Sequence, residues 1–321
     1  MGKRRLGSTD IEITPIGLGC MQFAGPGMVE QFYRALDQPS VTPVVKSALE
    51  GGINWFDTAE MYGRGASERA LTTALRESGA SPGTVVVATK WAPILRTAAS
   101  IGRTIDARIS SLQGYPIDLH QIHMPYGSLS AIPRQVRAMT ALCRAGQISS
   151  VGVSNFSARQ MRTASALLRG QGLTLASNQV QISLLNRKIE RNGVLETARQ
   201  LGVTLIAYSP LSSGVLSGKF HEDPANVRSR PRVRRLVGGL SPRALARTAP
   251  LVDALRAIAR AHGATASQIA LSWLTTYYGE TVVAIPGGTK PHHAQEAAAA
   301  MHLRLSEREL AQLDELSRPA R

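Results

Sequence analysis

Hydrophobic and polar positions along this chain follow two alternating patterns. Short apolar runs rich in β-branched residues recur, and longer segments with a 3.6-residue apolar period lie between them. We predict a β-strand for each short run. These runs occupy residues 16–19, 53–56, 84–89, 117–122, 148–153, 176–180, 203–207 and 281–285.

The longer segments predict α-helices that connect the strands. Pro133 and Ser157 stand where a first-turn proline and an N-cap are expected. Strands separated by helices require crossover connections and therefore a parallel sheet, and eight such units close into a barrel. The sequence predicts an α/β fold, a single (β/α)8 TIM barrel domain over residues 1–321. The helical segments are residues 41–50, 67–78, 131–144, 158–168 and 194–201.

Three segments lie outside this alternation. A turn between two apolar pieces at residues 5–13 predicts an N-terminal β-hairpin that caps the bottom of the barrel. Residues 209–250 predict a long connection, of a length that is usually functional or disordered. Residues 307–316 predict an extra C-terminal helix packed outside the barrel. Gly17 and Gly19 form a Gly-x-Gly pair without the third glycine of a dinucleotide fingerprint, so a doubly wound cofactor domain is disfavoured.

Composition narrows the class of protein. The chain has 321 residues, 43% of them hydrophobic, which is enough for a large core. The longest apolar runs fall well short of the ~20 residues that a membrane span requires. The basic N-terminus is followed by a polar stretch rather than by the apolar segment of a secretory signal. We therefore expect a soluble, cytoplasmic protein.

The charge of the chain raises nucleic acid as a partner. Its formal net charge is +15, and its densest basic cluster lies within residues 228–235, in a segment punctuated by proline and glycine. This placement favours a solvated loop, or one that contacts an anionic cofactor. The chain also lacks zinc-finger spacing and the aromatic-basic interleaving of RNA-binding sheets, so we do not favour nucleic acid.

Metal chemistry is disfavoured by the residue pattern. Only Cys20 and Cys143 are present, too few for a disulfide framework or a thiolate-rich metal site. His120 and His123 are three residues apart on a predicted strand, which directs their side chains to opposite faces. We therefore predict no metal site.

Four polar side chains are predicted to meet at one end of the barrel. Asp57, Lys90 and His123 each follow a predicted strand, and Tyr62 lies five residues beyond Asp57. In (β/α)8 barrels the catalytic groups lie at this carboxyl end of the strands. Each residue alone has a structural explanation. Asp57 could cap the turn that follows it and Tyr62 could be a packing residue, while Lys90 could be a solvated strand end and His123 a hydrogen-bonded structural histidine. Four such residues at one end of successive strands are harder to explain by chance.

This combination suits protonation of a carbonyl group as hydride arrives. A tyrosine hydroxyl, with an ordinary pKa of about 10, is a weak acid near neutrality unless a neighbouring cation favours its phenolate. Lys90 would supply the cation, Asp57 would hold the lysine, and His123 would hydrogen-bond the carbonyl oxygen. We therefore assign Tyr62 as the proton donor.

The chain also resembles the aldo-keto reductase superfamily over almost its whole length. The segment Asn54-Trp-Phe-Asp-Thr-Ala-Glu-Met-Tyr-Gly63 carries much of the likeness. The resemblance implies a barrel without a Rossmann domain, a nicotinamide cofactor extended across its top, and a catalytic tetrad of Asp57, Tyr62, Lys90 and His123. The other matching segments are residues 6–8, 16–21, 88–90, 118–123, 152–156, 178–179, 207–211, 216–219 and 285–288.

The resemblance implies further cofactor contacts. Ser154, Asn155 and Gln179 would hydrogen-bond the nicotinamide carboxamide, and Tyr208 would stack on the ring. A phosphate would bind at the N-terminus of a helix that begins near Pro291. The remaining cofactor positions are Cys20 and Met21, then Ser209, Leu211, Ser217 and Lys219 along the pyrophosphate, and Gly287, Thr289, Lys290, His293 and Glu296 at the adenosine.

Two departures from the family pattern affect specificity. Thr289 stands where related proteins often have an arginine for the 2′-phosphate, and Ala297 where many have an asparagine. Lys290, or an arginine within residues 228–235, could compensate, so we expect NADPH and leave NADH open. Residues that would border an apolar substrate mouth, or else serve only in packing, are Met21, Trp91, Met124 and Tyr126.

The leading hypothesis is an NADPH-dependent oxidoreductase that reduces an aldehyde or ketone to an alcohol. A second hypothesis is a regulatory subunit that binds NADPH with little turnover, as the potassium-channel β-subunit relatives of this superfamily suggest. A third, nucleic-acid binding through the arginine-rich loop, predicts an affinity that falls steeply with salt.

Overall fold

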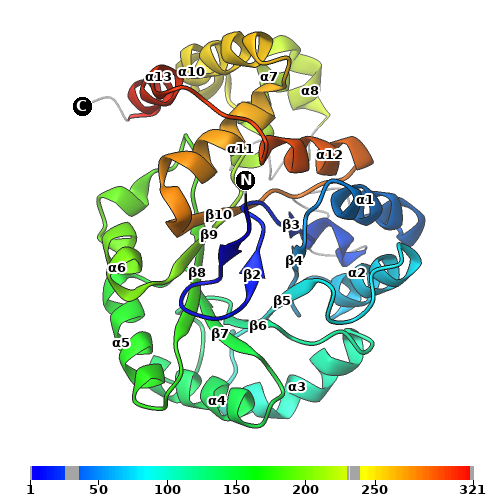
Figure 1. The fold of residues 1–321 in the computed structure, drawn as a ribbon, viewed down its shortest axis with the longest axis vertical. Coiled ribbons are helices and arrows are strands. Elements are labelled where there is room, and N and C mark those ends of the chain that lie inside the picture. Colours follow the sequence, from blue (N-terminus) through cyan, green and yellow to red (C-terminus); the bar gives the residue numbers. More distant parts are fainter. Residues whose placement is uncertain (1, 26–35, 230, 232–238, 319–321) are drawn as a thin grey trace.

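A ring of parallel strands forms the centre of the molecule (Figure 1). The computed structural model describes residues 2–25, 36–229, 231 and 239–318. Within them, one sheet has eight strands in chain order. The strands are β3 (Leu18–Gly19), β4 (Trp55–Asp57), β5 (Val86–Trp91), β6 (Leu119–Ile122), β7 (Ser150–Ser154), β8 (Leu175–Gln181), β9 (Thr204–Tyr208) and β10 (Val282–Ile285).

The sheet closes between its first and last strands. Parallel bridges join Ile16 to Ala284 and Gly19 to Gly287. The backbone N–H of Gly17 donates to the carbonyl of Ala284 at 2.9 Å. A Cβ on Gly17 would lie 2.3 Å from the Trp55 ring, so glycine is required where the chain passes this side chain. These contacts confirm the predicted (β/α)8 barrel.

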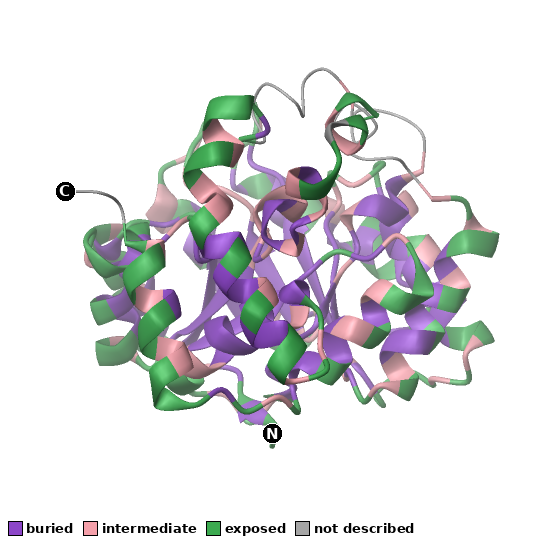
Figure 2. Cartoon of the chain, turned by 90° about the horizontal axis from the view of Figure 1, so that it is seen from above, coloured by how far each residue is buried: buried purple, intermediate pink, exposed green. Residues whose placement is uncertain are grey.

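Helices cover the outside of the barrel. Figure 2 shows buried strands surrounded by helices whose outer faces are exposed. In α1 the buried positions Val41, Val44, Val45 and Ala48 follow the helical period that predicted it. The helices are α1 (Gln38–Glu50), α2 (Ala66–Glu77), α3 (Ala99–Ser111), α4 (Ile132–Arg144), α5 (Ala158–Arg169), α6 (Val194–Leu201), α7 (Lys219–Glu222), α8 (Pro224–Arg228), α10 (Pro242–Ala261), α11 (Ala266–Tyr277), α12 (Pro291–Ala300) and α13 (Glu307–Ser317).

The N-terminal hairpin lies across one end of the barrel, as predicted. Its strands, β1 (Arg4–Arg5) and β2 (Glu12–Ile13), pair antiparallel. The Arg4 guanidinium donates to the carbonyls of Thr275 and Val282, and this fixes the hairpin to the end of α11 and the start of β10. In Figure 1 the hairpin lies in front of the barrel.

The long connection expected at residues 209–250 has secondary structure of its own. It contains a short irregular 3-10 turn (Ser212–Ser217), α7, α8 and the beginning of α10. Ser241 caps α10 by accepting a hydrogen bond from the N–H of Ala244, with Pro242 at the first helical position. Arg228 ends α8, whereas the other arginines of this cluster, residues 230, 232, 234 and 235, lie outside the described residues.

Two helices show no clear apolar period in the sequence. In α11 nine of the ten positions from Ala266 to Thr275 are buried, so no polar face alternates with an apolar one. In α3 the buried face contains Ser100, Arg108 and Ser111, which interrupt the apolar pattern. The C-terminal helix α13 packs against α10 and α11, outside the barrel as expected.

Candidate active site

The four predicted side chains come together at the carboxyl end of the strands. Asp57 is the last residue of β4 and Lys90 lies near the end of β5. His123 directly follows β6, and Tyr62 lies in the loop between β4 and α2. Lys90 is fully buried, Asp57 is 2% exposed, and Tyr62 and His123 are partly exposed.

Asp57 and Lys90 form a buried ion pair. The Lys90 ammonium donates to Asp57 Oδ1 and, at 2.9 Å, to the carbonyl oxygen of Thr58. The side-chain amides of Gln121 and Gln179 donate to Asp57 Oδ2 at 3.1 and 2.8 Å. Burial is the largest single effect and opposes the charged ammonium, but the charge of Asp57, its hydrogen bond and the neighbouring ionisable groups together raise the pKa of Lys90. Lys90 therefore stays cationic.

Tyr62 lies between this ion pair and His123. The Lys90 nitrogen is 5.3 Å from the centre of the Tyr62 ring, and the Tyr62 and His123 rings meet edge to face at 5.8 Å. Burial raises the pKa of Tyr62 above its ordinary value, although the charge of Lys90 acts in the opposite direction. The sequence predicted the effect of the cation but not that burial would exceed it. The phenol is therefore protonated at neutral pH.

His123 is a neutral imidazole in this arrangement. Burial, assisted by the charge of Lys90, lowers the pKa of His123 to about 3. Its Nδ1 is buried and has no hydrogen-bond partner. A neutral ring beside a phenol can hydrogen-bond a carbonyl oxygen without changing the net charge of the site.

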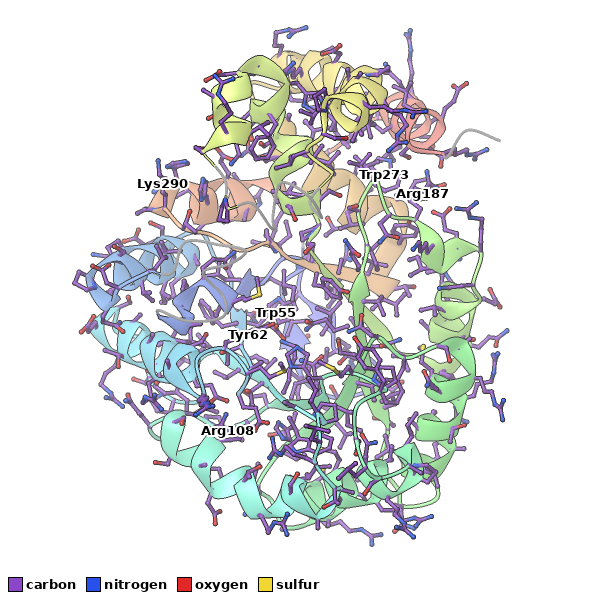
Figure 3. All side chains as sticks on the ribbon, turned by 180° about the vertical axis from the view of Figure 1, so that it is seen from behind. Trp55, Tyr62, Arg108, Arg187, Trp273 and Lys290 are labelled. Carbon is purple, nitrogen blue, oxygen red and sulfur yellow. The ribbon has the colours of Figure 1, made fainter. Side chains whose placement is uncertain are left out.

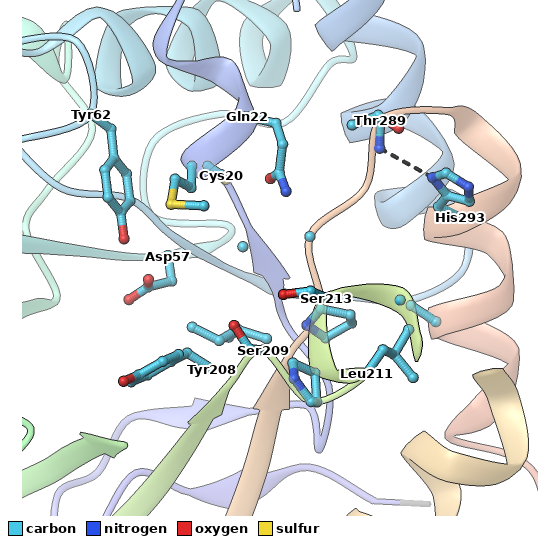
Figure 4. A pocket seen from close by; sticks show the side chains of 18 of the residues that line it. Cys20, Gln22, Asp57, Tyr62, Tyr208, Ser209, Leu211, Ser213, Thr289 and His293 are labelled. Atoms are coloured by element: carbon cyan, nitrogen blue, oxygen red, sulfur yellow. Dashed lines mark hydrogen bonds between the residues drawn. The ribbon is translucent and has the colours of Figure 1, made fainter. Parts of the chain in front are cut away.

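One cavity, with a volume of about 1330 Å³, joins the candidate tetrad to the predicted cofactor groove (Figure 4). Asp57, Tyr62 and His123 form part of its wall, whereas Lys90 lies behind it. Every predicted cofactor position lines the same cavity. These are Cys20, Met21, Ser154, Asn155, Gln179, Tyr208, Ser209, Leu211, Ser217, Lys219, Gly287, Thr289, Lys290, His293 and Glu296.

The polar groups expected at the nicotinamide are held by one another. Asn155 donates to Ser154 Oγ at 3.0 Å, and Ser154 donates to the carbonyl oxygen of Gln179 at 2.9 Å. The Tyr208 hydroxyl donates to Asn155 Oδ1 at 3.1 Å. Gln179 directs its amide N–H to Asp57, so it connects the ion pair to the cavity wall. These hydrogen bonds fix the side chains before any ligand binds.

The loop after β9 has a strained backbone. In the described part of the chain seven non-glycine residues have positive φ, and Ser209, Ser212 and Ser213 are three of them, at 49°, 47° and 55°. Such conformations cost about 1–3 kcal/mol each and gather at ligand-binding sites. Ser209 and Ser213 both line the cavity. The strain is therefore consistent with a loop shaped to follow a ligand.

The far end of the cavity is suited to an anion. Helix α12 begins at Pro291, and the side chain of its N-cap residue, Lys290, makes no hydrogen bond to the N–H groups of the first turn. The N–H of Thr289 donates to His293 Nδ1 at 3.2 Å, and burial lowers the pKa of His293 to about 4. Figure 3 shows Lys290 at the start of this helix, and its side chain is exposed. A helix N-terminus beside a lysine fits a phosphate.

The sequence reasoning missed Gln22. Its side chain is 7% exposed, and its Oε1 is buried without a hydrogen-bond partner. A Cβ on Gly287 would lie 2.6 Å from Gln22 Nε2, so the amide rests on that glycine. Figure 4 shows Gln22 between Cys20 and Thr289, where an extended ligand would pass. The unpaired oxygen fits a polar ligand, and its position beside the predicted Cys20 and Met21 was the available signal.

Other residues of the cavity wall were also missed. Most of them lie in the segment that leads into α1, in the turn after β9, in α8 and in α11, which carried no recognisable motif. Met61 lies next to Tyr62 in the matching segment and was not singled out. The additional residues are Leu36, Asp37, Ser40, Met61, Ser213, Gly214, Asn226, Ser267 and Leu271.

Two of the four predicted substrate-mouth residues do not line the cavity. Met21 and Met124 do. Trp91 is fully buried, and its indole N–H donates to Ser100 Oγ at 3.0 Å, so it packs against α3. Since neighbouring residues of a strand face opposite sides, Trp91 points outward where Lys90 points inward. Tyr126 is 67% exposed and lies outside the cavity wall.

Neither a metal centre nor a membrane span emerges from the described ranges. Among those residues no group of three or more His, Cys, Asp or Glu side chains could hold a metal ion. Likewise, no helix within them has both the length and the apolar character needed to cross a membrane.

Comparison with known sequences gives the class of protein. Pyridoxal reductase from chloroplasts of Arabidopsis thaliana is 30% identical over 316 residues, which cover 95% of this chain and 83% of the relative. An uncharacterized oxidoreductase of Mycobacterium bovis is 35% identical over 300 residues, which cover 92% of this chain and 86% of the relative. The similar proteins are thus oxidoreductases.

Comparison with solved structures gives the same fold. A thermostable aldo-keto reductase crystallised with the inhibitor epalrestat has a TM-score of 0.77 at 29% identity, covering 98% of this chain and all of the other. Glycerol dehydrogenase of Gluconobacter oxydans has a TM-score of 0.82 at 25% identity, and the match covers 98% of this chain and 94% of the other. The Aldo/keto reductase family model matches residues 15–318, and the chain belongs to this family. Aldo-keto reductases generally use NAD(P)H.

Proposed function

We propose that this protein is an NADPH-dependent oxidoreductase that reduces an aldehyde or ketone to the alcohol, with Tyr62 as the proton donor. One observation carries the proposal. A single cavity contains the phenol, the imidazole and the carboxylate, and it continues along the groove to the N-terminus of α12. A dinucleotide that spans this groove would bring its redox ring to the side chains that can protonate a carbonyl.

The residues divide the chemistry between them. A nicotinamide bound in this groove would supply hydride to the carbonyl carbon. The Tyr62 hydroxyl then gives its proton to the carbonyl oxygen, and the Lys90 charge stabilises the phenolate that remains. Asp57 holds Lys90 in place, and the neutral ring of His123 hydrogen-bonds the carbonyl oxygen.

The groove supports NADPH as the cofactor. Ser154, Asn155 and Gln179 present polar groups for a carboxamide, and the Tyr208 ring lies on the same wall. Lys290 and the N-terminus of α12 would hold a phosphate at the other end. Gln22 would offer its unpaired oxygen to a hydroxyl group of the cofactor.

The names of two relatives agree with this chemistry. Pyridoxal is an aldehyde, and a glycerol dehydrogenase acts on an alcohol. Both names describe interconversion of a carbonyl compound and its alcohol, which is the reaction that the cavity supports here.

A binding and turnover experiment tests the proposal. Purified protein is titrated with NADPH and NADH by fluorescence, and the same sample is then assayed for oxidation of each cofactor with a panel of aldehydes and ketones. We expect saturable NADPH binding and turnover of reactive aldehydes. Tight binding of NADPH with no turnover across the panel would instead support the regulatory-subunit hypothesis.

A further inference from the structure

Exposed apolar side chains gather beside the cavity mouth. In the described part of the chain the four most exposed large apolar residues are Leu95, Leu129, Tyr126 and Ile94, at 79%, 69%, 67% and 46%. All four lie on the loops that follow β5 and β6, and we call them the apolar rim. Single exposed apolar residues are ordinary on a protein surface, whereas a cluster indicates a binding surface.

Hydrogen bonds join the two loops, so the four side chains share one surface. The N–H of Leu95 donates to the carbonyl of Gly127 at 2.8 Å, and the N–H of Leu129 donates to the carbonyl of Arg96 at 2.9 Å. A Cβ on Gly127 would lie 3.4 Å from Ile94, which shows how closely the loops approach.

The backbone of Leu95 supports a functional role for this surface. Its φ is +55°, a conformation that leucine rarely adopts, and its side chain is exposed. The chain thus accepts both backbone strain and an apolar group in water at one position. Neither feature contributes to the core.

The apolar rim continues the wall of the cavity. The strands that carry Lys90 and precede His123 lead directly into its two loops. Met124, which lines the cavity, is two residues from Tyr126. Burial raises the pKa of Tyr208, and Tyr126 adds to this effect, so the two phenols are near one another. A ligand that extends from the cavity past Met124 therefore reaches the rim.

The charge on these loops is already neutralised. Arg96 forms an ion pair with Glu60 and donates to Thr104 Oγ1 at 2.9 Å. Its guanidinium also lies over the Trp91 ring. Because this cation is occupied, the rim favours a neutral apolar group over a carboxylate.

We propose that the apolar rim binds the aliphatic tail of a long-chain carbonyl substrate whose carbonyl group lies between Tyr62 and His123. This inference rests on the proposed carbonyl reduction and specifies its substrate class. A short aldehyde would lie wholly within the cavity, and only a longer chain would contact Leu95 and Leu129.

Chain-length dependence tests the inference. The ratio kcat/KM is measured with NADPH for the unbranched aldehydes from propanal to nonanal. Complete burial of one methylene group raises kcat/KM about fourfold, and a surface that covers one side of the tail raises it about twofold per methylene group. We expect this increase once the tail reaches the rim.

The variant Leu95→Ser/Leu129→Ser removes the aliphatic surface without touching the tetrad. Propanal should react as with the original protein, while the dependence on chain length becomes flat. Leu316→Ser is the matched control, because Leu316 is an exposed leucine, at 40%, on the distant helix α13. It should leave the whole series unchanged.

Failure of the tail-binding inference and failure of the proposed carbonyl reduction give different results. Normal propanal turnover with no increase along the series overturns this inference and leaves carbonyl reduction standing. An equal loss for every aldehyde in the double variant also overturns it, because the loops would then have only a structural role. A dimer that the double variant abolishes, together with a flat series, would assign the rim to contact between copies. If no aldehyde is reduced, the proposed function itself fails.

Discussion

Replacing Lys90 with methionine is the most informative test of the buried ion pair. The Lys90 side chain is fully buried and that of Asp57 is 2% exposed. Without the ammonium, Asp57 would keep only the amide donors of Gln121 and Gln179. Removing one partner of a buried pair costs about 3–5 kcal/mol, because the other charge stays buried without compensation. At about 2 °C per kcal/mol for a large domain, Lys90→Met should lower the melting temperature by roughly 6–10 °C.

A double-mutant cycle separates the pair from simple loss of packing. Asp57→Asn alone should also be destabilising, since Lys90 would then rely on the carbonyl of Thr58. The double variant Lys90→Met/Asp57→Asn leaves no buried charge and should recover most of the loss, while remaining inactive. Lys46→Met is the control, because Lys46 is 63% exposed and 3.9 Å from Glu50. Its effect should stay below about 1 kcal/mol.

Thermal unfolding at neutral pH, followed by circular dichroism, gives the melting temperatures of the original protein and of the four variants. We expect the double variant to be far more stable than the two single losses added together would make it. If Lys90→Met costs no more than Lys46→Met, or if the two single effects simply add, the ion pair does not have the energetic role assigned here.

Three further predictions concern neighbouring groups. Burial, with the charge of Arg108, lowers the pKa of His120 to about 3. The contribution of His120 to the free energy of unfolding should be full above its pKa in the unfolded chain, near 6.5, and should fall by about 1.4 kcal/mol per pH unit as the pH drops toward 3. Urea unfolding of His120→Gln should show a smaller loss. Lys290→Met should raise the Kd for NADPH about tenfold and leave NADH unchanged in fluorescence titrations; equal effects on both would refute a phosphate contact. Gln121→Leu removes one hydrogen bond to Asp57 and should lower kcat about tenfold. The Kd for NADPH should stay the same, because Gln121 is not part of the cavity wall, and weaker NADPH binding would contradict this prediction.

The sequence predicted the barrel because its strands are short, apolar and regularly separated. The candidate tetrad followed from the same pattern, since the end of a strand determines where a side chain lies. Asp57, Lys90 and His123 each fall within one residue of a strand end in the structure. Strand boundaries shifted by one or two residues without moving these side chains from the mouth.

Other features depend on contacts that one sequence does not display. Helix α11 is almost wholly buried, so its contribution of Ser267 and Leu271 to the cavity had no periodic signal. The error at Trp91 was avoidable, because strand alternation places it opposite Lys90. Gln22 is recognised only from its unpaired oxygen, a property of the folded chain.

Turnover by the variant Tyr62→Phe shows whether this phenol donates the proton. The variant removes the one hydroxyl assigned to proton donation and keeps the ring beside Lys90 and His123. NADPH oxidation with an aldehyde should fall by at least about a hundredfold, while the fluorescence-measured Kd for NADPH stays the same. Tyr115→Phe, at a phenol that donates to the carbonyl of Ala80 and is not part of the cavity wall, should retain full activity. Undiminished turnover in Tyr62→Phe would contradict the account.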